Sequence, residues 1–232
     1  MLDFKFIKLM GVIFTPEFSI GNKLLVADIF QDISGGKFDG ELISMPIPQN
    51  APSEIPRIIL NSQDGTWKLE VSLESTNIIF FKPLNLSVPV PDINEFGEFV
   101  KDLFKSYMIK TQIKVQRLAF ITERYCEIKD ITPSQFIAAR YCKEEYLKNI
   151  FHNPDAVELH ALKKYQYEGF HINSWVRLKS SNLADDAKTP ILLLVNDINT
   201  FSEPIVTYSE SDIERFFNII PEHLEAIIKL YF

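Results

Sequence analysis

Two hairpin signals constrain the fold of this chain more than any other feature of its sequence. Asp64-Gly65 and Glu168-Gly169 each separate two segments in which apolar and polar residues alternate. A two-residue turn of this kind between alternating segments is typical of a β-hairpin, because both turn positions favour residues that tolerate positive φ. The sequence therefore predicts antiparallel β-structure, in which each turn fixes the register of its two strands.

The first hairpin signal predicts an apolar face. Pairing about that turn sets Leu60 opposite Leu69 and Ile58 opposite Val71. Side chains of paired residues lie on the same face of a sheet, so these four residues form a continuous apolar surface.

A third strand is predicted after this hairpin. A turn at Ser75-Thr76 would set Val71 opposite Phe80 and Leu73 opposite Ile78. The apolar face then continues across the third strand, and a register shift of one residue would destroy it.

The second hairpin signal gives the same division into two faces. One face collects apolar pairs, such as Tyr165 with Ile172 and Ala161 with Val176. The opposite face is mostly polar, as expected for a sheet that is covered by helices on one side. A loop is predicted over residues 182–190, followed by an apolar strand over 191–198.

Helices are predicted where apolar residues recur at helical spacing. Asp92 and Glu95 form a capping box, and Thr132 precedes a proline at the first helical position. Pro221 should kink or split the last helix. The four predicted helices cover residues 22–33, 92–107, 132–151 and 209–230.

The order of these elements repeats along the chain. Residues 1–110 and 111–232 each give a β-α-β-β-β-α half, which predicts an α+β fold with antiparallel sheets, each packed on a long helix. This order is similar to the helix-grip topology and to the saddle-like half-domains of the TATA-binding protein. It suggests an internal duplication, and the two sheets could join edge to edge.

The charge of the chain limits its partners and compartment. The net charge is -7, without a Lys/Arg-rich run, which disfavours nucleic acid as a partner because such binding depends on neutralising phosphates. No signal peptide or membrane span is apparent, and two cysteines do not make a disulfide framework. We expect a cytoplasmic protein that does not contact a membrane.

Residues that could carry chemistry are few. The four histidines, His152, His160, His171 and His223, show no metal-ligand spacing, and neither a nucleophile elbow nor a phosphate-binding loop is present. We therefore expect no metal, no cofactor and no catalytic residue. A possible polar site would combine side chains of the second half that lie near its sheet: His160, His171, Arg177 and Asp197.

Apolar residues on the polar faces suggest a binding surface instead. Leu162 and Trp175 share the polar face of the second hairpin, and Ile79 and Phe81 fall on the polar face of the first half. An apolar patch with polar surroundings often marks an interface. The alternative is that a loop or the other half covers these four residues.

Short motifs resemble a sporadically distributed prokaryotic family of about this length. They comprise Pro56 and a Ser-x-Asp-Gly turn at 62–65, Arg117 before an aliphatic strand, and an apolar strand that ends in Asn196-Asp197-Ile198-Asn199. The family's Arg-Tyr-x-Asn signature is only partly matched at Arg124-Tyr125-Cys126. The family has no assigned activity, so the resemblance implies a prokaryotic accessory protein and transfers no catalytic residue.

The sequence thus favours a noncatalytic binding protein, with the possibility that it forms a homodimer. Its partner would be another protein or a small apolar ligand between sheet and long helix. Two alternatives remain, an enzyme that uses the polar site and a saddle-shaped nucleic-acid binder.

Overall fold

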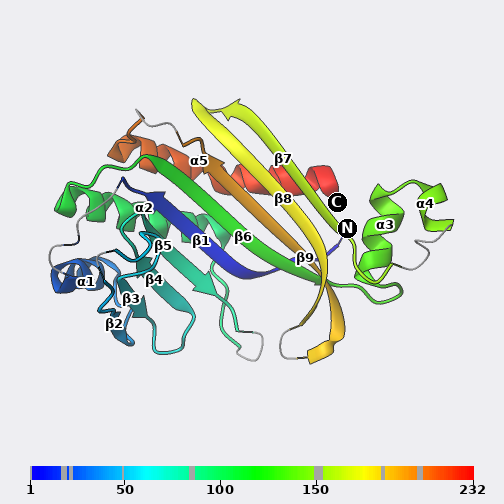
Figure 1. The fold of residues 1–232 in the computed structure, drawn as a ribbon, viewed down its shortest axis with the longest axis horizontal. Coiled ribbons are helices and arrows are strands. Elements are labelled where there is room, and N and C mark those ends of the chain that lie inside the picture. Colours follow the sequence, from blue (N-terminus) through cyan, green and yellow to red (C-terminus); the bar gives the residue numbers. More distant parts are fainter. Residues whose placement is uncertain are drawn as a thin grey trace.

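The strands of both predicted halves join a single antiparallel sheet (Figure 1). The computed structural model describes residues 2–16, 20, 23–48, 50–83, 87–148, 154–183, 186–202 and 206–232. Within these residues the sheet has nine strands, and the fold is α+β.

The elements follow the predicted order closely. The strands are β1 (Lys5–Phe14), β2 (Leu42–Ser44), β3 (Ile58–Asn61), β4 (Trp67–Val71), β5 (Ser75–Phe81), β6 (Arg117–Glu127), β7 (Glu158–Tyr167), β8 (Phe170–Leu183) and β9 (Asp186–Thr200). The helices are α1 (Lys23–Ile33), α2 (Ile93–Thr111), α3 (Pro133–Tyr141), α4 (Glu144–Lys148) and α5 (Glu210–Tyr231). None of the described helices is both long and apolar enough to cross a lipid bilayer.

The strand order is β2-β3-β4-β5-β1-β6-β9-β8-β7. β1 and β6 are therefore neighbours at the centre, and their pairing sets Gly11 opposite Phe120 and Leu9 opposite Thr122. We call the β1–β6 pair the seam of the sheet. The seam answers the question that the sequence left open, because strands from before and after residue 110 form one continuous sheet.

The core lies between the sheet and the helices α1, α2, α3 and α5, which share one face of it. α2 and α5 run behind the strands in Figure 1. Phe120 of β6 contacts both helices, with its ring centroid 5.7 Å from that of Phe96 on α2 and 6.1 Å from that of Phe217 on α5. Burial of these large aromatic side chains removes apolar surface from water and stabilises the packing of α2 and α5 on the sheet.

Gly11 allows α2 to approach the seam closely. A Cβ atom at this position would lie 2.4 Å from Cγ1 of Val100 on α2 and 3.3 Å from the ring of Phe217 on α5. Any larger residue would force the two helices away from β1. A glycine inside a strand is typical of such close approach.

A second glycine lies where the two helices meet. A Cβ atom at Gly97 of α2 would lie 3.0 Å from the carbonyl oxygen of Phe217 and 3.1 Å from Cγ of Pro221. Proline has no N–H, so the Phe217 carbonyl lacks the amide donor that residue 221 would otherwise provide within the helix. Gly97 therefore lies against the part of α5 whose internal bonding Pro221 interrupts.

Both hairpins about the Gly-containing turns have the predicted registers. Leu60 pairs with Leu69 and Ile58 with Val71, as expected. The second hairpin pairs Tyr167 with Phe170, and its turn residues Glu168 and Gly169 both have positive φ. The capping box of α2 is present as predicted, and Thr132 caps α3 ahead of Pro133, where Gln135 completes a second capping box.

The predicted turn at Ser75-Thr76 was wrong. The chain turns two residues earlier, after Ser72, so that Val71 pairs with Thr76 and Leu69 with Ile78. The reason is local, because the Ser72 hydroxyl accepts hydrogen bonds from the amides of Glu74 (3.2 Å) and Ser75 (2.9 Å) and fixes the turn there. The shift is by an even number of residues, and the predicted apolar face is therefore preserved.

Three further boundaries differ from the predictions. The loop over 182–190 is largely strand, because β8 extends to Leu183 and β9 starts at Asp186. The helix predicted over 132–151 is interrupted after Tyr141 and resumes as the short α4, and the predicted residues 149–151 lie outside the described ones. The last helix is not split at Pro221 and continues to Tyr231, because its packing against α2 and the sheet outweighs the loss of one helical bond.

We predict that Gly11→Ala lowers the free energy of unfolding by about 1–3 kcal/mol, because the added methyl group overpacks the contact with Val100. Chemical denaturation measures the change. In the double variant with Val100→Ala, the space is restored, and the loss should be smaller than the sum of the two single losses by about 0.5 kcal/mol or more. Strictly additive losses would contradict the proposed contact.

Candidate functional site

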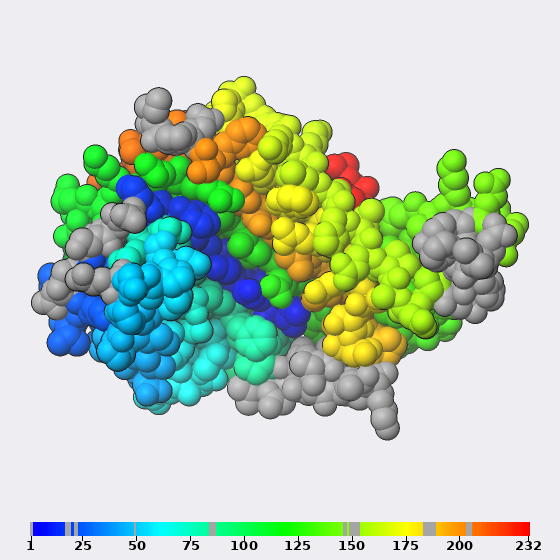
Figure 2. Space-filling model, in the orientation of Figure 1, coloured from blue at the N-terminus to red at the C-terminus, as the bar shows by residue number. Residues whose placement is uncertain are grey.

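The eight residues singled out in the sequence all lie on the face of the sheet opposite the helices. We call it the open face, and Figure 2 views the molecule from this side, with β1, β6, β9 and β8 next to one another at the surface. Strand alternation assigned seven of the eight residues to this face, and the pairing of Asp197 with Ile121 and Trp175 adds the eighth. The open face is therefore the first candidate for a binding surface.

Six residues of the open face form a row across the sheet, one from each of six neighbouring strands. Each pairs with the next in register, and at about 4.8 Å between strands the row is roughly 24 Å long. The row, from β5 to β7, is Ile79, Met10, Ile121, Asp197, Trp175 and Leu162. The sheet thus connects three of the four predicted partner-binding residues through Met10, Ile121 and Asp197.

A second, parallel row contains the fourth partner-binding residue and is more polar. It comprises Phe81, Lys8, Glu123, Val195, Arg177 and His160. Lys8 and Glu123 form an ion pair of 3.0 Å, and the Arg177 guanidinium lies 5.0 Å from the centroid of the Trp175 ring. Phe81 and Leu162 are 47% and 42% exposed, so water reaches the β5 end of the second row and the β7 end of the first row.

The predicted polar site is not gathered in one cleft. His160 pairs with Arg177, and Asp197 lies in the adjacent row. His171 is six residues from Arg177 along β8, which separates the two by about 20 Å. These four side chains therefore share a face but could not act on one bound molecule of ordinary size.

Metal-ligating and thiol groups give no further site in the described residues. They include no cluster of three or more His, Cys, Asp or Glu side chains that could hold a metal ion. Cys126 and Cys142 are both free, and burial raises the pKa of the Cys126 thiol, which disfavours the nucleophilic thiolate. His152 lies outside the described residues.

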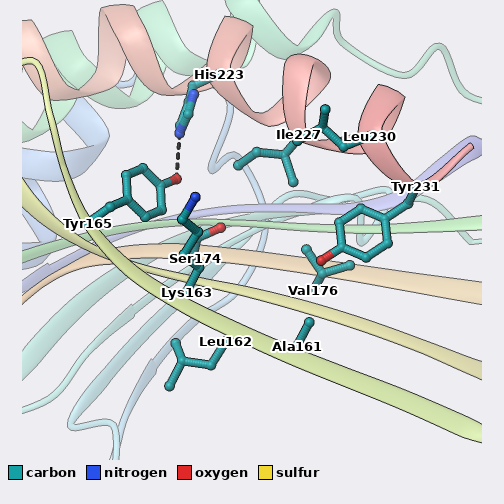
Figure 3. Close-up of a pocket in the computed structure, with 10 residues that line it drawn as sticks. All are labelled: Ala161, Leu162, Lys163, Tyr165, Ser174, Val176, His223, Ile227, Leu230 and Tyr231. Atoms are coloured by element: carbon teal, nitrogen blue, oxygen red, sulfur yellow. Dashed lines mark hydrogen bonds between the residues drawn. The ribbon is translucent and has the colours of Figure 1, made fainter.

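The second candidate is a pocket on the helix side of the sheet, between β7, β8 and the C-terminal half of α5 (Figure 3). We call it the β7–α5 pocket. Its volume is about 440 Å³, and the ten residues that line it are labelled in Figure 3. It lies near the edge of the sheet, because β7 is the last strand in the strand order.

One end of the β7–α5 pocket is polar. The Tyr165 hydroxyl and Nε2 of His223 share a hydrogen bond of 2.5 Å, and Lys163 and Ser174 lie beside them (Figure 3). The Tyr167 ring stacks on His223 at a centroid distance of 3.8 Å. Burial lowers the pKa of His223 and raises that of Tyr165, so both groups are neutral near pH 7. The neutral Nε2 atom can then accept a hydrogen bond from the Tyr165 hydroxyl.

The other end of the pocket is apolar. Its side chains come from all three elements, and the large ones are on the last turns of α5. They are Ala161, Val176, Ile227, Leu230 and Tyr231. Leu230 is 82% exposed, so the apolar end opens to solvent beside it.

α3 holds the C-terminal end of α5, whose last turns form this apolar wall, by hydrogen bonds. The Tyr231 carbonyl accepts hydrogen bonds from Nε of Arg140 and from the hydroxyl of Tyr141, both 3.0 Å long. These two bonds satisfy a carbonyl at the end of α5, where no further helical turn supplies a donor. The position of the apolar wall therefore depends on α3.

Apart from Leu162, sequence reasoning did not identify the residues of this pocket. The pattern assigned Tyr165, Ala161 and Val176 to the buried face, and it left His223 without a partner. Residues 161–176 and 223–231 meet only because α5 crosses behind β7 and β8. The available signals were two polar residues, His223 and Lys163, at positions that face the space between the sheet and α5.

Comparisons with known proteins provide no name for either candidate site. The chain matches no protein-family model, and a search of curated proteins found no relative.

We predict that His223 makes the protein less stable in mild acid. Its pKa in the folded state lies below the ordinary value of 6.5, so the unfolded chain binds the proton first as the pH falls below that value. The free energy of unfolding should therefore decrease from pH 7.5 to pH 5 more steeply for the wild type than for His223→Gln. Urea denaturation across this range measures the difference, and parallel pH profiles would contradict the prediction.

Proposed function

We propose that this protein is a noncatalytic binding protein and that the β7–α5 pocket holds a small, largely apolar ligand. The observation that carries the proposal is the pocket itself, with a volume of about 440 Å³ and a wall that is mostly apolar. Pockets that bind small molecules typically have 300–1,000 Å³, apolar walls and a few polar groups that orient the ligand.

The placement of the described side chains supports binding over catalysis. A general acid or base must lie within hydrogen-bond reach of the atom on which it acts. On the open face, Asp197 lies in the first row, His160 lies in the second row, and His171 lies outside both rows. In the pocket, His223 is engaged by Tyr165 and stacked on Tyr167.

We propose further that the two halves of the chain arose by duplication and form a saddle-like or helix-grip arrangement. Two features support this interpretation. β1 pairs with β5, and β6 pairs with β9, so the first strand of each half pairs with its last. A long helix follows each of these last strands, α2 after β5 and α5 after β9.

We predict that Ala161→Phe abolishes binding of the neutral fluorescent probe N-phenyl-1-naphthylamine, because the new ring fills the apolar end of the β7–α5 pocket. Fluorescence titration measures the binding. His160→Phe is the matched control, since it adds a ring one residue away on the open face and should leave the affinity within about twofold. Equal binding by both variants would show that the probe is bound elsewhere.

A second candidate function is capture of a protein partner on the open face. The two exposed ends of the rows favour it, with apolar residues between them on neighbouring strands. The partner-binding residues in this proposal are Trp175, Leu162, Ile79 and Phe81.

We predict that Trp175→Ala weakens capture of such a partner and changes Tm by less than about 2 °C, because its ring is only partly buried. Pull-down and thermal unfolding measure the two effects. Gln166→Ala, which changes a residue of β7 on the same open face, should change neither partner capture nor Tm. A loss of about 3 kcal/mol in stability would instead identify Trp175 as a core residue.

A further inference from the structure

The β7–α5 pocket is asymmetric in a way that selects among small ligands. Figure 3 shows Lys163, Tyr165, Ser174 and His223 together at one end, whereas the side chains at the other end are hydrocarbon or aromatic. A ligand that fits both ends must itself have a polar and an apolar end.

The charge at the polar end is positive. The residues that line the pocket include Lys163 but no Asp or Glu. Within the described part of the chain, no carboxylate forms an ion pair with Lys163, and its ammonium group lies 5.6 Å from the centroid of the Tyr165 ring. His223 adds no charge near neutral pH, because its burial favours the neutral imidazole.

A neutral group beside Lys163 can donate a hydrogen bond to an anion. Ser174 is buried and lies beside the Tyr165 hydroxyl, whose own proton is donated to His223, so the Ser174 hydroxyl is the neutral donor near the ammonium group. An ammonium group and a hydroxyl group suit a carboxylate, which accepts several hydrogen bonds at once. A cationic ligand would be repelled by Lys163, and a purely apolar ligand would remove water from these polar groups without replacing its hydrogen bonds.

We infer that the ligand is an amphiphile with an anionic head group and an aliphatic tail, such as a medium-chain carboxylic acid. Its carboxylate binds Lys163 at the polar end, and its tail lies between Val176 and Ile227 toward Leu230. This inference rests on the proposed function of the same pocket and adds the chemical class of the ligand.

The test compares two probes of equal chain length, decanoate and 1-decanol, as competitors of N-phenyl-1-naphthylamine. In the wild-type protein, decanoate should displace the fluorescent probe at a concentration at least tenfold lower than decanol. In Lys163→Gln, this advantage should disappear, whereas the displacement by decanol should be unchanged. Lys164→Gln is the matched control, because it removes a charge from the neighbouring residue on the open face and should keep the wild-type preference.

The outcomes separate this inference from the proposed function. If N-phenyl-1-naphthylamine and decanol bind but decanoate has no advantage, or keeps it in Lys163→Gln, the anionic ligand class is wrong and the apolar pocket stands. If the fluorescent probe does not bind to the wild type at all, the proposed function itself fails. A loss of preference in Lys164→Gln as large as in Lys163→Gln would mean that only net charge matters, which would also overturn the inference.

Discussion

The close contact between α2, α5 and the seam of the sheet is the constraint on which the rest of the fold depends. Two glycines make it possible, Gly11 against the side chain of Val100 and Gly97 against the backbone of α5. Packed interiors leave no space for even one additional carbon atom at such contacts. The two long helices therefore lie together over β1 and β6, and the nine strands are held as one sheet.

This central packing explains where the candidate sites lie. Because α2 and α5 gather at the seam, the described helices that lie over the outer strands β7 and β8 are α3 and the last turns of α5, and the β7–α5 pocket forms between α5 and these strands. On the opposite side, none of these helices covers the sheet, and the two rows of the open face remain at the surface. The same arrangement of helices thus leaves both the β7–α5 pocket and the open face accessible for binding.

Much of this fold could be predicted from local patterns in the sequence. The two hairpin registers and the helix caps depend on residues that are close in the chain, and alternation assigned Trp175 and Leu162 to the correct face. The turn after Ser72 was predicted two residues too late, because both positions preserve the apolar face and the choice between them depends on the hydrogen bonds of the Ser72 hydroxyl. Whether β1 pairs with β6 could not be predicted, since seam pairing depends on contacts between residues about 110 positions apart.

The candidate site was less predictable than the fold for the same physical reason. Predicting the rows of the open face requires Met10 and Ile121. Their neighbours on adjacent strands are known only once the strand order is known. The pocket needed the crossing of α5 behind β7, which brings His223 to Tyr165. Periodicity identifies which face of an element is buried, but it does not identify the partner of that face.

Pro221 has an effect on α5 that reaches beyond its own helix. Since it supplies no amide hydrogen, the Phe217 carbonyl lacks its helical donor, and this oxygen lies 3.0 Å from the place that a Cβ atom at Gly97 would take. A larger residue at 97 would press against a carbonyl that has no bond from residue 221 to hold it. The interruption of the bonding in α5 thus falls where α2 touches the backbone of its neighbour.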